Sequence, residues 1–152
     1  MSNVLVLLLK LMVVSGIERH GVTATIQFVN GPSTVLHLSE KKSEYYLKLV
    51  QRSLESRHPV GVALDENRLI IEVAGADNDI ALRVRDRDKE TQEVSFEGHD
   101  GIFTLRRDNP EFTRIAQILS ASIQDKKRIW FVAKKPLLVI NDAQLYIEEK
   151  AK

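Results

Sequence analysis

The chain has 152 residues, of which 43% are hydrophobic and 28% are charged, as expected of a soluble globular protein with one ordinary domain or two very small ones. The sequence has no cysteine, which excludes disulfides and thiolate metal sites and fits a cytoplasmic location. A formal net charge of +1 does not indicate a strongly basic nucleic-acid-binding protein.

The most apolar run of the sequence covers Val4–Val14. We predict a buried strand of the mature protein here, because Lys10 interrupts the run and no basic segment precedes it, as one would in a secretion signal. The run is also too short to cross a membrane. A cleaved leader and an apolar helix are the alternatives.

The rest of the first half reads as two strands, a helix and a hairpin. Residues 22–28 alternate apolar and polar side chains, which predicts a half-buried strand, and residues 35–38 predict a shorter one. Apolar residues at helical spacing predict a helix over 43–57, with Ser43 as its N-cap. Strands over 60–64 and 68–73 then form a hairpin.

The segment from Gly75 to Asp79 is polar and rich in turn-forming residues, so it predicts the boundary between two units, 1–75 and 76–152. Asn109 is the predicted N-cap of a second helix, with Pro110 at the first helical position. The strands predicted in this half cover residues 80–85, 94–96, 102–105, 128–134 and 137–140, with a short edge strand over 144–148 before a charged tail.

The second half repeats the apolar pattern of the first at a spacing of 69 residues, which aligns Val60 with Ile129 and Val62 with Phe131. We interpret this as an internal duplication rather than the alternation that any two segments of this kind share. Each unit then reads β-β-β-α-β-β, an α+β organisation. The residues predicted to face the two cores are Val60, Val62, Leu64, Ile129, Phe131 and Ala133.

In the order and size of its elements, each unit resembles the OB-fold, a five-stranded barrel with a helix between its third and fourth strands. The resemblance covers nearly the whole chain as two tandem copies. The alternative assembly joins the middle five strands into one sheet flanked by both helices, and it resembles the duplicated sheet-plus-helix proteins of the Whirly and PUR type. Both resemblances imply binding of single-stranded nucleic acid.

No catalytic, nucleotide-binding or metal-binding motif stands out in the sequence. It contains no GxSxG motif, no glycine-rich phosphate loop and no metal-ligand spacing among His20, His37, His58 and His99. We therefore expect a protein that is not an enzyme and has no cofactor. An active site assembled from scattered residues is the third hypothesis.

One constellation combines cations with an aromatic ring, which is the chemistry that holds single strands, since cations follow phosphates and rings stack on bases. Trp130, the only tryptophan, is predicted on the outer face of its strand, covered by another element or offered to a ligand. The alternative is a buried hairpin strand with charged ends. The candidate nucleic-acid-binding residues are Arg106, Arg107, Lys126, Lys127, Arg128, Trp130, Lys134 and Lys135.

The sequence thus predicts a binding protein, and single-stranded nucleic acid is the first hypothesis for its ligand. The second is a protein-interaction or assembly module that docks a partner, or another copy of the chain, through an edge strand. We expect no membrane span.

Overall fold

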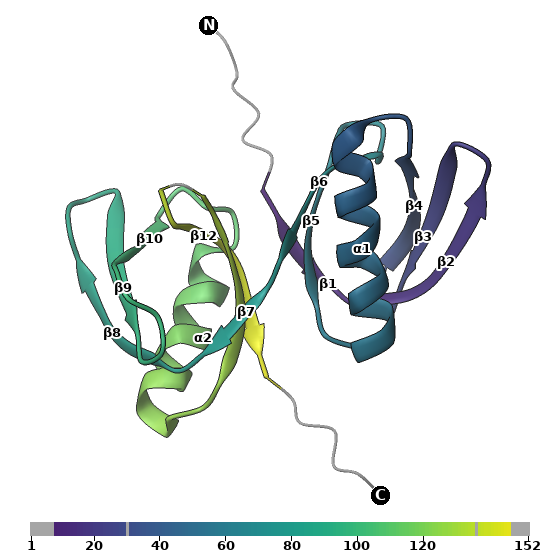
Figure 1. The fold of residues 1–152 in the computed structure, drawn as a ribbon. Helices are drawn as coiled ribbons and strands as arrows, with labels where there is room; N and C mark the ends of the chain where they lie inside the picture. Colours follow the sequence, from purple (N-terminus) through teal and green to yellow (C-terminus); the bar gives the residue numbers. More distant parts are fainter. Residues whose placement is uncertain (1–7, 30, 136, 147–152) are drawn as a thin grey trace, which may run out of the picture. The chain divides into compact units, whose positions relative to one another are not determined.

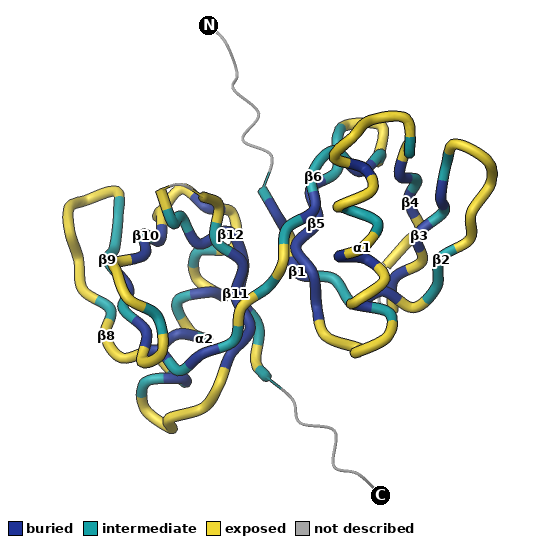
Figure 2. Tube along the Cα trace, viewed as in Figure 1, coloured by how far each residue is buried: buried dark blue, intermediate teal, exposed yellow. Residues whose placement is uncertain are grey.

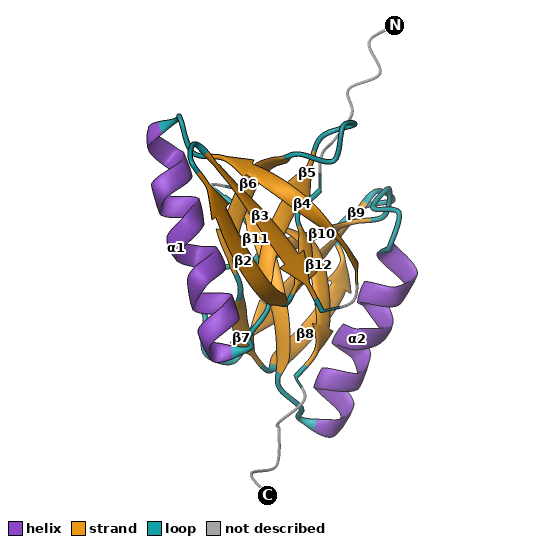
Figure 3. Ribbon diagram, turned by 90° about the vertical axis from the view of Figure 1, so that its right-hand side faces the viewer, coloured by secondary structure: helices purple, strands orange, loops and turns teal. Residues whose placement is uncertain are grey.

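The computed structural model describes residues 8–29, 31–135 and 137–146 (Figure 1). The chain divides into two compact units, residues 1–75 and 76–152. Its class is α+β, as predicted, with strands forming most of each unit and one helix lying beside them (Figure 3). Residues 4–7 of the predicted first strand lie outside the described residues. The rest of that run is not one strand, because β1 ends at Met12 and β2 begins at Val14 in a different sheet.

Unit 1 contains two three-stranded sheets, ordered β1-β5-β6 and β2-β3-β4. A parallel bridge between Val35 and Leu69 links the two sheets. The elements of this unit are β1 (Lys10–Met12), β2 (Val14–His20), β3 (Thr23–Phe28), β4 (Gly31–His37), α1 (Lys41–Ser56), β5 (Val60–Leu64) and β6 (Ile70–Gly75).

The core of unit 1 forms where α1 packs over the inner faces of these sheets. Val60 and Val62 lie in this core and Leu64 packs against it, so their predicted inward orientation is confirmed. Burial runs along almost all of β5, whereas the hairpin that joins β2 to β3 is exposed (Figure 2). Burial alternates along β3, where apolar and polar side chains alternate, whereas β5 has no polar side chain and is buried on both faces.

Unit 2 contains one six-stranded sheet, ordered β7-β11-β12-β10-β9-β8. Ile129 and Phe131 lie in its core and Ala133 packs against it, as predicted. The elements of this unit are β7 (Asp77–Asp79), β8 (Ala81–Asp86), β9 (Thr91–Phe96), β10 (Phe103–Arg106), α2 (Phe112–Asp125), β11 (Ile129–Lys134) and β12 (Val139–Leu145).

The consecutive strands β7 and β8, separated only by Ile80, form the two edges of this six-stranded sheet. No sheet closes in the described part of the chain, so the barrel implied by the resemblance to the OB-fold is not formed. The alternative single sheet through the middle of the chain is wrong, because β5 and β6 belong to a different sheet from β8, β9 and β10.

Both predicted helix caps need correction. Helix α1 begins at Lys41 with Glu40 as its N-cap, and the hydroxyl of Ser43 instead donates a hydrogen bond to the carbonyl oxygen of His37 at 2.6 Å. Helix α2 begins at Phe112, two residues after Pro110. The Asn109 side chain accepts a hydrogen bond from the amide of Glu111 at 2.8 Å, so it caps the turn that leads into the helix.

A buried serine near the end of each helix makes two hydrogen bonds that fix the chain on either side. In unit 1, Ser53 Oγ accepts from the amide of Val14 at 3.1 Å and donates to the carbonyl of His58 at 2.6 Å. In unit 2, Ser122 Oγ accepts from the amide of Ala81 at 2.9 Å and donates to the carbonyl of Lys127 at 2.6 Å. Each serine therefore joins the first residue of β2 or β8 to the turn after the helix.

Among the residues that the structure describes, four other than glycine have left-handed backbone conformations, and they occupy two kinds of position. Arg57 and Lys126 end α1 and α2, and their amides donate to the carbonyls of Ser53 and Ser122. Arg68 and Leu138 precede the last strand of their units. A residue with a Cβ atom is sterically strained in this conformation, so the surrounding hydrogen bonds must hold these turns in place.

We predict that Ser53→Ala and Ser122→Ala each destabilise their unit by about 1–3 kcal/mol, because each change leaves a buried amide and a carbonyl without their partner. The free energy of unfolding, measured in urea, checks this. The exposed Ser120, on α2, is the matched control, and Ser120→Ala should change it by less than about 0.5 kcal/mol. Equal effects of the variants at positions 120 and 122 would contradict the assignment.

Candidate functional site

Trp130 lies in the middle of β11, between β7 and β12, where it pairs with Asn78 and Gln144. Its side chain is only 7% exposed, and its ring stacks on that of Tyr146, with centroids 5.4 Å apart. The outward face predicted for this residue is thus covered rather than offered to a ligand. Base stacking on Trp130 would require the ring of Tyr146 to move away.

Arg106 and Arg107 follow one another at the end of β10, and each has an acidic partner. Arg106 makes a two-pronged pair with Asp108, with Nε and Nη2 at 3.0 and 2.9 Å from its two oxygens. Arg107 Nη2 lies 2.5 Å from Asp86, and its guanidinium packs 5.3 Å from the ring centre of Phe112. The charge of both predicted residues is therefore neutralised locally.

The remaining predicted cations lie at the two ends of β11. Lys126, Lys127 and Arg128 form the exposed turn that precedes it, and Lys134 and Lys135 follow at its other end. At a rise of about 3.4 Å per residue, the strand separates these ends by about 17 Å. The structure thus brings the predicted cations together as two groups rather than as one surface.

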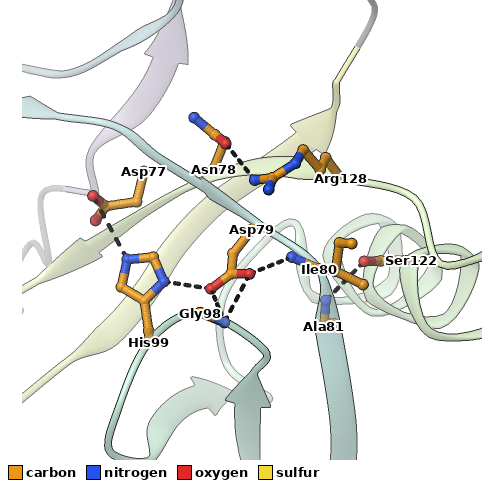
Figure 4. Close-up of polar contacts among 9 residues, drawn as sticks. All are labelled: Asp77, Asn78, Asp79, Ile80, Ala81, Gly98, His99, Ser122 and Arg128. Carbon is orange, nitrogen blue, oxygen red and sulfur yellow. Dashed lines mark hydrogen bonds and ion pairs between the residues drawn. The ribbon is translucent and has the colours of Figure 1, made fainter.

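A second polar site, which the sequence did not reveal, surrounds Asp79 at the corner between β7 and β8 (Figure 4). The buried carboxylate of Asp79 accepts hydrogen bonds from the amide of Gly98, at 2.8 and 3.0 Å, and from its own neighbour Ile80, at 2.7 Å. A Cβ at position 98 would lie 3.1 Å from a carboxylate oxygen, so glycine permits this close approach. Asp79 thus ties the β7–β8 corner to the loop after β9.

His99 completes this site between the carboxylates and the aromatic core. Its Nδ1 donates to Asp79 Oδ2 at 2.5 Å, and its Nε2 lies 3.9 Å from Asp77 Oδ1. The edge of the imidazole faces phenylalanine rings at centroid distances of 5.5–6.2 Å, and these rings belong to Phe96, Phe103 and Phe131. The arrangement holds the ring in one orientation.

Burial by itself would raise the pKa of Asp79, but the hydrogen bonds from His99, Ile80 and Gly98 outweigh it, so the pKa lies below its usual value. A carboxylate and the histidine that it orients are two of the three members of a nucleophilic triad, and the third is a nucleophile such as a hydroxyl group. Over the described residues, however, no hydroxyl group hydrogen-bonds to His99, and no group of three metal-ligating side chains forms. The cluster therefore serves best as a structural clamp.

A third polar network joins the start of α2 to β12, and the sequence did not predict its buried members. Arg114 donates to the carbonyl of Ala143 at 2.8 Å and to Glu111 at 3.1 Å, and it also pairs with Asp142. Asn109 donates to the carbonyl of Asn141 at 3.1 Å. These contacts give hydrogen-bond partners to the buried side chains of Asn109 and Asp142, and buried polar groups need such partners.

Comparisons with protein-family models, with curated proteins and with solved structures found no match to this chain. Among the helices in the described part of the chain, none is long and apolar enough to span a membrane.

We predict that Asp79→Asn destabilises the protein by about 1–3 kcal/mol at pH 7, because it removes the charge that accepts these hydrogen bonds. The folded-state pKa of Asp79 is lowered, so its contribution is present above about pH 4 and is lost as the pH falls through the folded-state pKa. The difference in unfolding free energy between wild type and variant should therefore shrink at acid pH.

Urea unfolding at a series of pH values from 7 down to about 2.5 measures this difference. Asp100→Asn is the control, since Asp100 is an exposed carboxylate in the same loop, and it should change stability by less than about 0.5 kcal/mol. A difference for Asp79→Asn that stays constant across this range would show that its charge does not stabilise the fold.

Proposed function

We propose that this chain is a non-enzymatic binding protein whose ligand is single-stranded nucleic acid. The observation that carries the proposal is the cationic turn, the three consecutive residues Lys126, Lys127 and Arg128 between α2 and β11. All three are exposed. Over the residues that the structure describes, no carboxylate oxygen lies within 4.0 Å of their side-chain nitrogens, so none of the three forms an ion pair. The exposed guanidinium of Arg128 donates to the neutral amide oxygen of Asn78, so all three charges are left for a phosphate backbone to meet.

The backbone of the cationic turn is fixed even though its side chains are exposed. Lys126 ends α2 in a left-handed conformation, with its amide bonded to the carbonyl of Ser122. The Ser122 hydroxyl holds the carbonyl of Lys127, and Arg128 Nη1 donates to Asn78 Oδ1 at 2.8 Å. A turn that is already ordered loses less conformational entropy when it binds a ligand, which favours affinity.

The charge of the whole chain sets the expected strength of binding. With a net charge of only +1, long-range attraction is small, and local phosphate contacts must supply most of the affinity. For single strands, the logarithm of the association constant falls with the logarithm of salt concentration by about 0.7 per neutralised phosphate. Three contacts at the cationic turn therefore give a slope of about 2.

We also propose that the two units are copies of one ancestral unit. The duplication is supported by features that both units share and that do not follow from the order of their elements. They include the buried serines Ser53 and Ser122, which are 69 residues apart, and the left-handed residues that end both helices. A further parallel is the bridge from Thr104 to Val139, which corresponds to that between Val35 and Leu69.

The second candidate function is docking of a protein partner, or of a second copy, on an edge strand. The position of β8 at the edge of its sheet and the exposure of Leu82 favour it. However, β8 has a bulge between Ala81 and Arg83 and carries charged residues, and both features discourage edge pairing. Single-stranded nucleic acid is therefore the preferred ligand.

We predict that the protein binds a labelled oligothymidylate at low salt, and that the cationic turn contributes about 2 to the slope of the salt dependence measured by fluorescence anisotropy. Lys126→Gln with Lys127→Gln should reduce the slope by about 1.4. It should also weaken binding by up to about thirtyfold at low salt, because each exposed charged contact contributes up to about 1 kcal/mol.

The matched control removes two cations from the turn between β8 and β9, through Arg87→Gln with Lys89→Gln, and thus has the same net charge. It should bind as wild type does. If wild type fails to bind at low salt, or if both double variants weaken binding equally, the cationic turn is not the site.

A further inference from the structure

Helix α1 carries four exposed side chains along one line of its surface, and we call them the α1 stripe: Lys41, Tyr45, Lys48 and Arg52. They are four, three and four residues apart, which places them within an arc of roughly 60° at 3.6 residues per turn. With a rise of about 1.5 Å per residue, the stripe is about 16 Å long. Three cations therefore flank one aromatic ring on a rigid element.

The aromatic member of the stripe does not belong to the core. Its neighbour Tyr46 packs against the core of unit 1, whereas Tyr45 is 59% exposed. The buried side of α1 is formed by other residues, among them Leu49 and Val50. The ring of Tyr45 lies beside that of Tyr46, with centroids 6.3 Å apart, but most of its surface is open to solvent.

The cations of the stripe are also directed to solvent. Glu44 and Glu55 run along one side of the stripe, but no carboxylate in the described residues lies within the 4.0 Å ion-pair limit of Lys41, Lys48 or Arg52. The two glutamates limit the width of the positively charged surface, but the α1 stripe itself stays positively charged. Charge complementarity therefore favours a narrow, linear anion over a broad acidic surface.

Helix α2 provides an internal comparison, because the positions 69 residues later carry different chemistry. They are Pro110, Arg114, Gln117 and Ala121, and they include no aromatic ring. The one cation among them, Arg114, is engaged by Asp142, Glu111 and the carbonyl of Ala143. The stripe is thus a property of α1 and not of the shared architecture.

We infer that the α1 stripe is a contact surface for single-stranded nucleic acid, in which the cations hold phosphates and Tyr45 stacks on a base. The inference rests on the proposed function and adds to it a second site with a stacking residue. Alternating cations and rings bind single strands without sequence preference, since every base has a stacking face. The stripe supplies the stacking ring that the buried Trp130 does not.

The test compares variants of the full chain for binding to a labelled oligothymidylate of about 12 nucleotides, which lies within the usual site sizes of single-strand-binding proteins. Tyr45→Ala should weaken binding about fivefold or more, because one base–aromatic contact contributes roughly 1–3 kcal/mol. Tyr45→Phe keeps the ring and should bind within about twofold of wild type. Lys48→Gln with Arg52→Gln should lower the salt slope by about 1.4.

Arg87→Gln with Lys89→Gln again serves as the control of equal net charge and should leave affinity and slope unchanged. Thermal unfolding of every variant shows whether the fold is retained, and the exposure of the stripe predicts unchanged midpoints. Vesicles of anionic lipid serve as a second probe, and wild type should bind them less tightly than the oligonucleotide.

The outcomes separate the inference from the proposed function. If wild type does not bind the oligonucleotide, the proposed function fails and the inference fails with it. If binding depends on Lys126 and Lys127 but is unchanged by Tyr45→Ala and by the variant at 48 and 52, the proposed function stands and the α1 stripe is excluded. Preference for vesicles would also overturn the inference.

Discussion

The hydrogen bonds of one buried serine in each unit are the constraint on which the rest of the architecture depends. Ser53 and Ser122 each join the first residue of a strand to the turn after a helix, so one side chain sets the position of three elements. Alanine would fit either space, but it would remove the acceptor of a buried amide, which costs more than a hydrogen bond contributes on average. Serine is therefore more stabilising than alanine at both positions.

The same constraint explains how two units with similar internal hydrogen bonds can carry different side chains on their surfaces. In unit 2 the turn that Ser122 holds carries Lys126–Arg128, and in unit 1 the cations and the ring lie along α1 instead. Neither set contributes to the core of its unit. Surface residues can vary at little cost to stability when hydrogen bonds and packing elsewhere fix the backbone. The side chains on the surface can thus differ between units whose internal hydrogen bonds are alike.

Local periodicity made the α+β class and the inward faces of β5 and β11 predictable from the sequence, but not the division of the first apolar run into β1 and β2, nor β7, which lies in a segment predicted as a turn. Val62 and Phe131 face their cores because successive side chains of a strand point to opposite faces. Only one orientation of each strand therefore buries its apolar side chains. The caps were misplaced, because Ser43 and Asn109 bond to backbone groups that a local pattern does not specify. The bond from His99 to Asp79 joins residues 20 positions apart, and that from Arg114 to Asp142 joins residues 28 apart, so only the folded chain reveals them. Likewise, Trp130 lies on the predicted outer face, but its cover by Tyr146 depends on how the chain returns after β12.

Amide hydrogen exchange followed by NMR tests most directly whether the serines hold these corners. The account predicts that the amides of Val14 and Ala81, which donate to serine hydroxyls, exchange as slowly as amides in the centre of their sheets. In Ser122→Ala, protection at Ala81 should fall while that at Val14 remains. Rapid exchange at both amides in the wild-type protein, or unchanged protection at Ala81 in the variant, would contradict it.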